Sequence, residues 1–303
     1  MSARVLALDA GQTGSRASGS DEPERVVEIG GLVTDRPVVA QLADRVRTGL
    51  AHLGAATVVA IGSSGLPGQG GASELLALLA GTSVQRVLLT HDSVTNYLAT
   101  LGPSPGVVVA AGTGVVTLAV SETAMARVDG WGYLIGDAGS GYWIGRAGLD
   151  AVLRAFDGRG PATALTAVVQ QEFPDLAEAY LELQADDAKA ARIARYAKVV
   201  TELARTDQVC RTICLDAAAE LAHSAITGLR RVGLGAASRV EIGMSGRLFG
   251  ADVVRGEFVR LVADAHPDAR FSTGTGGSLA GAALLPSLPA ASPLSSLVDT
   301  ASR

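Results

Sequence analysis

The first stretch of this 303-residue chain that could do chemistry lies at its start and combines an acid with small and hydroxyl residues. It reads Val5-Leu6-Ala7-Leu8-Asp9-Ala10-Gly11-Gln12-Thr13-Gly14-Ser15-Arg16-Ala17, which predicts an apolar strand, a turn and a second short strand. Gly11 and Gly14 permit a tight turn in which backbone N–H groups approach a ligand closely. Asp9 lies where the end of a strand would point a carboxylate at a metal ion. The stretch therefore carries donors suited to phosphate and an acid suited to its metal.

A second stretch, Val107–Leu118, repeats this layout about a hundred residues later. An apolar strand leads into the turn Gly112-Thr113-Gly114, and a second apolar strand follows. A single strand–glycine–strand sequence is usually an ordinary hairpin, so the prediction rests on the recurrence. Two matching hairpins indicate two related halves, each of which offers backbone donors and a threonine hydroxyl to a phosphate chain held between them.

Alternating strands and helices must position the first turn. The predicted strands cover 25–30, 57–61 and 84–90, and the predicted helices cover 38–53, 73–79 and 93–101. Such alternation indicates a largely parallel sheet with helices on its faces.

The second half is predicted to be mainly helical. A strand near 126–129 precedes a glycine-rich segment, a long helical region runs from 147 to 234 with breaks near 157–161 and Pro174, and a strand covers 239–242. The last folded element is expected near 276–285. The tail from Pro286 is rich in proline and serine and is expected to be frayed.

Composition limits the class of protein. The length predicts about two domains, and the 48% content of hydrophobic residues is enough for substantial cores. A net charge of −5 without a basic run argues against nucleic-acid binding. No apolar run reaches the roughly 18 residues that a membrane span requires. With the first strand beginning near Arg4, no signal peptide is expected. We therefore expect a soluble cytoplasmic protein without a nucleic-acid or membrane partner.

A family resemblance joins these features. The glycine-rich segment Gly130-Trp131-Gly132-Tyr133-Leu134-Ile135-Gly136-Asp137-Ala138-Gly139-Ser140-Gly141-Tyr142-Trp143-Ile144-Gly145, taken with both hairpins, resembles the BadF/BadG-type ATPase and N-acetylglucosamine kinase family of the actin/hexokinase/Hsp70 superfamily. The resemblance extends from Val5 to about Leu285. It implies an α/β fold of two ribonuclease-H-like domains with an ATP-binding cleft between them. The expected domains are 1–111 with about 281–303, and 112–280. A homodimer is expected.

The chain departs from the family pattern in the first turn, in the glycine-rich segment and at Asp35. Where the family commonly has Asp-Gly-Gly-Gly-Thr, Gln12 brings a side chain near the phosphates, and Ala138 replaces the glutamate that usually follows Asp137. The Cys/His zinc cluster of the neighbouring repressor and sugar-kinase family is absent from the sequence, which excludes that branch.

The resemblance implies two acidic residues with separate roles. Asp9 would organise the Mg²⁺ ion that bridges the ATP phosphates, although it could also be a turn-forming residue. Asp92 would be the base that takes the proton from the primary hydroxyl of a sugar. The pair Asp92-Ser93 is also typical of a helix N-cap. Both interpretations hold if Ser93 caps the helix while Asp92 faces the cleft.

Ligand-binding residues follow from the same resemblance. Those expected to bind ATP are Gly11, Gln12, Thr13, Gly112, Thr113, Gly114, Gly243, Ser245 and Gly246. Those expected to bind the sugar are Asp35, Thr113, Gly130, Trp131, Gly132 and Asp137. Small residues near the adenosine let a planar base slide against backbone. Asp137 precedes a helix and could instead be its cap.

Asp35 determines the predicted substrate. N-acetylglucosamine kinases of the family place an asparagine one step after Thr34, and a carboxylate there would favour a protonated amine. The sequence therefore predicts phosphorylation of an amino sugar at C6, with glucosamine as the substrate and N-acetylglucosamine as the alternative. Asp35 could instead cap the helix that follows Pro37.

Two other functions compete with a kinase. An ATPase activator of the same family would need cysteine ligands for an iron–sulfur cluster. The chain's cysteines, Cys210 and Cys214, lie in one predicted helix, where we expect buried small apolar residues. A nucleotide-dependent sensor without catalysis is the second alternative, against which the presence of Asp9 and Asp92 argues.

Overall fold

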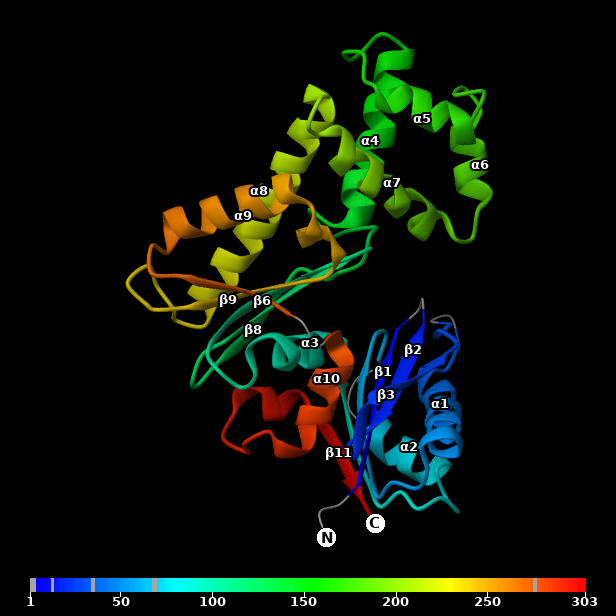
Figure 1. The fold of residues 1–303 in the computed structure, drawn as a ribbon, viewed down its shortest axis with the longest axis vertical. Helices are drawn as coiled ribbons and strands as arrows, with labels where there is room; N and C mark the ends of the chain where they lie inside the picture. Colours follow the sequence, from blue (N-terminus) through cyan, green and yellow to red (C-terminus); the bar gives the residue numbers. More distant parts are fainter. Residues whose placement is uncertain (1–3, 12–13, 34–35, 67–69, 275–276) are drawn as a thin grey trace. The chain divides into compact units, whose positions relative to one another are not determined.

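The computed structural model describes residues 4–11, 14–33, 36–66, 70–274 and 277–303. The chain divides into two compact units (Figure 1). The first contains Met1–Val108, Val120–Met125 and Ser272–Arg303, and the second contains Val109–Ala119 and Ala126–Phe271. Each unit has one sheet with helices packed on it, so the predicted α/β class is confirmed. Gln12, Thr13 and Asp35 lie outside the described residues.

A six-stranded mixed sheet forms the centre of the first unit, in the order β11-β5-β4-β1-β2-β3. Its strands are β1 (Val5–Ala10), β2 (Ser15–Gly19), β3 (Glu22–Ile29), β4 (Val58–Ser63), β5 (Arg86–His91) and β11 (Asp299–Ser302). β1, β4 and β5 are parallel, while β2, β3 and β11 are joined by antiparallel pairing. The carboxyl ends of the three parallel strands lie at the same end of the sheet, so Asp9 and His91 both lie at that end.

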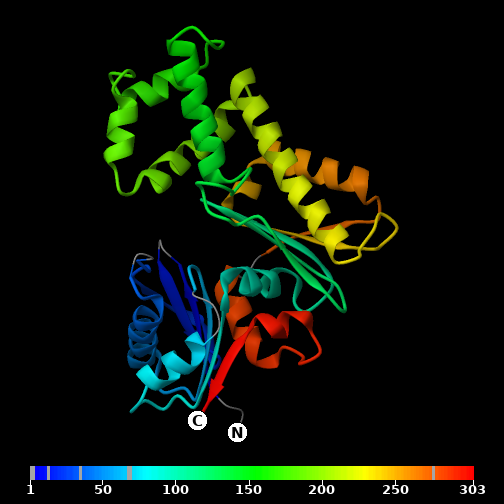
Figure 2. The ribbon, with the colours of Figure 1, turned by 180° about the vertical axis from the view of Figure 1, so that it is seen from behind.

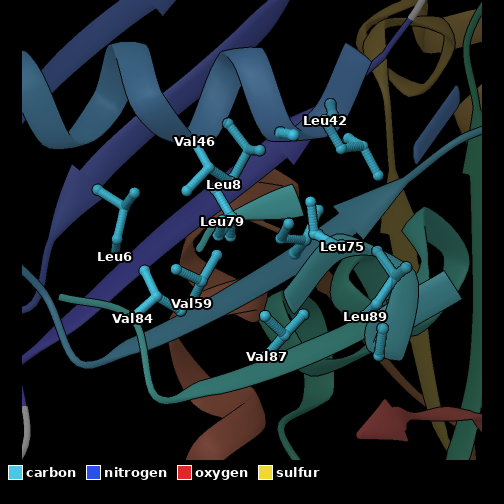
Figure 3. Close-up of a cluster of buried hydrophobic side chains, with 14 of the residues drawn as sticks. Leu6, Leu8, Leu42, Val46, Val59, Leu75, Leu79, Val84, Val87 and Leu89 are labelled. Carbon is cyan, nitrogen blue, oxygen red and sulfur yellow. The ribbon is translucent and has the colours of Figure 1, made fainter. Parts of the chain in front are cut away.

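Helices α1 (Val38–Leu53) and α2 (Gly71–Leu78) cover one face of this sheet. Apolar side chains recur along α1 at the spacing of one helix face, and they meet alternate side chains of the strands. Figure 3 shows this core between the helices and the sheet. Its labelled members are Leu6, Leu8, Leu42, Val46, Val59, Leu75, Leu79, Val84, Val87 and Leu89.

Helices α3 (Asp92–Leu101) and α10 (Gly277–Leu284) pack against each other and against the opposite face (Figure 2). Glycines make this close packing possible. A Cβ at Gly281 would lie 1.7 Å from the Thr95 carbonyl oxygen, and one at Gly62 would lie 2.2 Å from Thr95 Oγ1. No side chain larger than hydrogen fits at either position without moving α3.

The C-terminal tail is folded, so the prediction of a frayed tail was wrong. Residues Asp299–Ser302 form β11, which pairs antiparallel with β5 at the edge of the sheet. Asp299 Oδ2 accepts hydrogen bonds from the backbone N–H groups of Gly70 (3.0 Å) and Ala72 (2.8 Å) at the start of α2. Leu294 is fully buried. The tail is held by long-range pairing, which its proline- and serine-rich composition does not reveal.

The second unit contains a five-stranded sheet in the order β10-β9-β6-β7-β8. Its strands are β6 (Gly106–Ala111), β7 (Val115–Val120), β8 (Met125–Val128), β9 (Glu241–Ser245) and β10 (Arg270–Thr273). Its α-helices are α4 (Gly141–Phe156), α5 (Leu165–Glu172), α6 (Ala179–Ala185), α7 (Lys189–Leu203), α8 (Gln208–Arg231) and α9 (Asp252–Ala265). The predicted helical region is thus divided among five helices, α4 to α8.

Cys210 and Cys214 are buried within α8, which confirms them as small core residues. Burial raises the pKa of the Cys210 thiol to about 11 and that of the Cys214 thiol to about 12. Among the described residues, no helix combines the length and the apolar character needed to cross a membrane.

Candidate functional site

Asp9 lies at the end of β1, as the sequence predicted, and forms an ion pair that the sequence analysis missed. Its Oδ2 is 2.9 Å from Nη2 of Arg16, which lies directly opposite it in the β1–β2 ladder. The Asp9 side chain is 18% exposed and that of Arg16 is 44% exposed. A reader of the sequence could have found this pair, because a four-residue turn places residues 9 and 16 across from each other.

The described ends of the first hairpin turn form a compact backbone structure. The N–H of Gly11 donates to the carbonyl of Gly14 (3.1 Å), and the carbonyl of Gly11 accepts from the N–H of Leu32 (2.9 Å). The turn is therefore tied both to itself and to the segment after β3. Gln12 and Thr13, its central residues, and Asp35 remain sequence-based predictions.

Asp92 is the first residue of α3 and follows β5 directly. Its Oδ1 is 2.9 Å from Nδ1 of His91, and its side chain is 30% exposed. The same His91 nitrogen accepts from the N–H of Ser93 (3.1 Å) and lies 2.9 Å from Ser93 Oγ. His91 therefore caps the helix, so neither residue of the Asp92-Ser93 pair is the N-cap that the sequence allowed. Because the imidazole supplies the cap, the Asp92 carboxylate is not used for it.

In the second unit, the Gly112-Thr113-Gly114 turn is joined to the start of α4. The N–H of Gly112 donates to the carbonyl of Gly114 (2.8 Å). The carbonyls of Gly112 and Thr113 accept from the N–H groups of Gly141 (2.8 Å) and Tyr142 (2.9 Å). These bonds satisfy donors that a helix N-terminus otherwise leaves unpaired. A Cβ at Gly141 would lie 2.8 Å from the Gly112 carbonyl oxygen, so this contact requires glycine.

The loop between β8 and α4 is organised by Asp129, a residue that sequence reasoning did not select. Asp129 has a positive φ of 57°, and its carboxylate accepts from the N–H groups of Gly130 (2.7 Å), Asp137 (2.8 Å) and Ala138 (2.9 Å). The Asp129 carboxylate thus binds backbone N–H groups at the beginning and at the end of the loop. An aspartate directly before glycine is a turn signal, and this was the clue available in the sequence.

Asp137 lies inside this loop, buried and with a positive φ of 60°. Its Oδ1 accepts from the N–H of Gly132 (3.3 Å), and its Oδ2 lies 2.5 Å from where a Cβ of Gly114 would stand. Burial raises the pKa of the Asp137 carboxyl, and the neighbouring Asp129 carboxylate raises it further. Ser140 caps α4 by accepting from the N–H of Trp143 (3.2 Å), so Asp137 is not the cap.

Trp131 lies in the same loop with 61% of its surface exposed. The Arg127 guanidinium stands 4.9 Å from the centre of its ring, a cation–π contact. Arg127 also donates to the carbonyls of Asp129 (3.2 Å) and Gly130. Arg127, which the sequence analysis did not select, therefore supports the ring that was predicted to border the sugar.

The predicted adenosine-binding turn lies at the end of β9 beside the glycine–threonine turn. Gly246 has a positive φ of 97°, and a Cβ there would stand 2.2 Å from the Ala111 carbonyl oxygen. Ala111 directly precedes Gly112. Gly243 lies within β9, and Ser245 ends it. The second unit thus brings Gly112–Gly114, Asp137 and Gly246 together, while Asp9, Gly11 and Asp92 belong to the first unit.

The first unit thus places the partly exposed carboxylates of Asp9 and Asp92 at the ends of parallel strands, and the second places the buried Asp137 beside a glycine-rich turn. A profile of the BadF/BadG/BcrA/BcrD ATPase family matches residues 36–284. The chain belongs to this family.

Individual relatives are similar to parts or to most of the chain. An N-acetyl-D-glucosamine kinase of Dictyostelium discoideum is 34% identical over 161 residues, which is 52% of this chain and 50% of that protein. An N-acetylmuramic acid/N-acetylglucosamine kinase of Clostridium acetobutylicum is 36% identical over 81 residues, 26% of each protein. The matched stretches therefore span half or less of these curated relatives.

A solved structure is similar over a larger share. The crystal structure of a putative N-acetylglucosamine kinase from Chromobacterium violaceum has a TM-score of 0.74 and 25% identity. The similarity covers 93% of this chain and 98% of that one.

Proposed function

We propose that the protein is an ATP-dependent sugar kinase that transfers the γ-phosphoryl group of ATP to the C6 hydroxyl of N-acetylglucosamine. The observation that carries this proposal is the position of the Asp92 carboxylate and its freedom from a capping role. Its carboxylate lies at the carboxyl end of a parallel strand, is partly exposed, and is not used to cap α3 because His91 performs that task. The Asp92 carboxylate is therefore accessible to a substrate while His91 lies beside it, and a carboxylate in this position can serve as a general base.

In the proposed reaction, Asp92 accepts the proton of the sugar hydroxyl as its oxygen attacks the γ-phosphorus. The bond from phosphorus to the β–γ bridging oxygen breaks, and ADP leaves with that bond's electron pair. Phosphoryl transfer depends mainly on positioning and charge neutralisation. The backbone of the two glycine-rich turns and the Thr113 hydroxyl would position the phosphates.

Asp9 is the residue that would hold Mg²⁺. Among the described residues, no group of three or more His, Cys, Asp or Glu side chains could enclose a metal ion. A single carboxylate nevertheless fits this ion, because Mg²⁺ at kinase sites is held by one or two carboxylates, by phosphate oxygens and by water. When bound, Mg²⁺ would neutralise phosphate charge.

The β8–α4 loop would bind the sugar. Gly130 and Gly132 have positive φ angles of 80° and 84°, which glycine adopts readily. Arg127 supports the exposed Trp131 ring, which could lie against the apolar face of a sugar. The Asp137 carboxyl is an acceptor for a sugar hydroxyl. This assignment rests on the position of these residues in the family pattern and on the order that Asp129 imposes on their backbone.

The choice of sugar differs from the one that the sequence favoured. The glucosamine prediction depends on Asp35, whose structure is not described. The names of the Dictyostelium and Clostridium relatives both include N-acetylglucosamine as a substrate, which supports this sugar in preference to glucosamine. Glucosamine therefore becomes the comparison that the experiment must include.

The test is ADP release from Mg·ATP with N-acetylglucosamine, glucosamine, glucose or no sugar, measured side by side with purified protein. We expect turnover to depend on sugar and to be fastest with N-acetylglucosamine. Faster turnover with glucosamine would restore the prediction that the Asp35 carboxylate recognises the amine of the sugar. ADP release that is independent of every sugar would overturn the kinase proposal.

A further inference from the structure

We propose that His91 is a positioning residue that acts through Asp92 and takes from it the proton that this base removes from the sugar hydroxyl. This inference rests on the proposed kinase function and deepens it, because it gives the neighbour of the base a part in the same proton transfer. Capping of α3 through Ser93 does not by itself explain why the Asp92 carboxylate also contacts the imidazole.

One nitrogen of His91 has three polar neighbours. Nδ1 lies 2.9 Å from Asp92 Oδ1, 2.9 Å from Ser93 Oγ and 3.1 Å from the backbone nitrogen of Ser93. The N–H of Ser93 can only donate, whereas an ionised carboxylate can only accept. An Nδ1 without a hydrogen therefore satisfies Ser93 but faces the lone pairs of an ionised Asp92. The contact between Nδ1 and Oδ1 is a hydrogen bond only when a proton lies between these two atoms.

The sugar hydroxyl can supply this proton. Asp92 takes it as the hydroxyl oxygen attacks the γ-phosphorus, and the carboxyl then passes it to His91 Nδ1. The Asp92 carboxylate is restored, and the ring becomes an imidazolium that donates to it in a charge-assisted hydrogen bond. The imidazolium finally releases a proton to water, which its 33% exposed side chain allows. One proton thus leaves the hydroxyl and one reaches the solvent.

Asp92 is the ionisable side chain that contacts the His91 ring. On β11, Asp299 also carries a charge, but its Oδ2 is held by two backbone N–H groups at the start of α2. On β4, the residue paired with His91 is the neutral Ser63. In α2, Glu74 is exposed, and α10 contains no ionisable side chain. The proton of the base therefore has a defined acceptor in the imidazole.

Replacement of His91 by a residue that caps a helix but does not titrate separates the two roles of the imidazole. Asparagine and serine both favour the N-cap position, so His91→Asn and His91→Ser keep the cap and lose the proton acceptor. With the sugar that the wild type phosphorylates fastest, we expect each variant to lower kcat about tenfold or more at neutral pH and to leave KM within about twofold. His52→Asn is the matched control, because His52 is exposed on α1 of the same unit, and its kcat should equal that of the wild type.

The pH profile of kcat is a readout that a purely capping role would not change. Imidazole changes charge between about pH 5 and 8, and a ring that is already protonated cannot take the proton from Asp92. Wild-type kcat should therefore fall as the pH drops through this range, and the fall should move to lower pH in both His91 variants. In an Asp92→Asn background, His91→Asn should cause no further loss, because His91 acts through Asp92.

Thermal unfolding of each variant shows whether the cap is kept. If the wild type phosphorylates the sugar and both His91 variants keep its kcat and its pH profile, His91 is a cap alone and this inference is wrong, while the kinase proposal stands. A further loss of kcat in the Asp92→Asn background would also contradict action through Asp92. If the wild type releases no ADP in response to any sugar, the kinase proposal is wrong and the role of His91 is withdrawn with it.

Discussion

At the scale of single residues, Asp9 and Asp92 lie at the same end of one sheet, but their carboxylates contact different side chains. β1, β4 and β5 run parallel in neighbouring positions, so the residues that follow them collect at one edge of the sheet. Asp9 meets Arg16 through a hairpin, whereas Asp92 meets His91 through the start of a helix. Arg16 pairs with the Asp9 carboxylate, whereas His91 caps α3 in place of Asp92, which the proposed base requires.

Asp92→Asn should abolish most of the turnover while leaving substrate binding nearly intact. The amide keeps the size of the side chain but cannot take the proton, and general-base catalysis typically contributes about 10²- to 10⁴-fold. We expect a fall in kcat within this range. ATP affinity measured by calorimetry should change by less than about twofold. A variant that retains wild-type kcat would show that Asp92 is not the base.

Asp35→Asn tests the residue that separates the two candidate sugars. If Asp35 lies beside the sugar, the neutral amide should raise kcat/KM for N-acetylglucosamine relative to glucosamine, because an unpaired buried carboxylate is costly. A shift of about tenfold or more in this ratio is expected. The measurement is kcat/KM for both sugars in both proteins. An unchanged ratio would show that Asp35 does not determine the choice between the two sugars.

At the scale of elements, the β8–α4 loop uses two carboxylates in a small space. Asp129 is bonded to three backbone N–H groups, while Asp137 is buried against the Gly112–Gly114 turn. The raised pKa of Asp137 means that the ionised form costs stability in the folded protein. The buried Asp137 carboxylate therefore lowers the stability of the folded protein at neutral pH, which is a common cost of residues that serve in binding.

Asp137→Asn should raise stability at pH 7. A carboxyl whose folded pKa is raised contributes its full stability below its unfolded pKa and loses that contribution as the pH rises through the folded value. The stabilising effect of the variant should therefore be greatest at neutral pH and shrink towards pH 4. Denaturant midpoints from pH 4 to pH 8 measure this, with Asp44→Asn as an exposed control. A stabilisation that grows on acidification would contradict the assignment. The Asp137→Asn variant should also bind N-acetylglucosamine more weakly than the wild type.

β11 shows where local patterns lose their predictive value. The first hairpin, the helix after β5 and both glycine turns were predictable because their signals lie within a few consecutive residues. β11 has only four residues, and it forms a strand because it pairs with β5, which lies more than 200 residues earlier in the chain. The roles of His91 and Asp129 were missed for a related reason, since they depend on which backbone N–H groups the fold brings within reach.

Removal of the cap that β11 gives to α2 should lower stability without affecting chemistry. Asp299→Ala deletes the acceptor for the N–H groups of Gly70 and Ala72, and the loss of such a cap costs about 1 kcal/mol. Ser302→Ala, at an exposed position of the same strand, is the control. Chemical denaturation of both variants measures the cost. Equal stability of the two would show that the Asp299 contacts contribute nothing.

At the scale of the whole molecule, the residues proposed to bind one sugar are divided between two units. Asp92 belongs to the first, and Gly130, Trp131, Gly132 and Asp137 belong to the second. The phosphate turns are divided in the same way. The recurrence of the hairpin was visible in the sequence, but the proposed assignment of sugar contacts to both units rests on the family resemblance, because no local signal links Asp92 to the β8–α4 loop.

Hydrogen–deuterium exchange tests whether both units take part. We predict that N-acetylglucosamine slows exchange in peptides covering 86–95 and 129–138 at the same sugar concentration, because a single bound molecule would order both. A non-hydrolysable ATP analogue should slow exchange over 5–16 and 107–118. Peptides of α5 to α7, which carry no proposed ligand contacts, serve as the internal control. Protection confined to one unit would mean that the sugar is bound by that unit alone, and the roles assigned to residues of the other would have to be withdrawn.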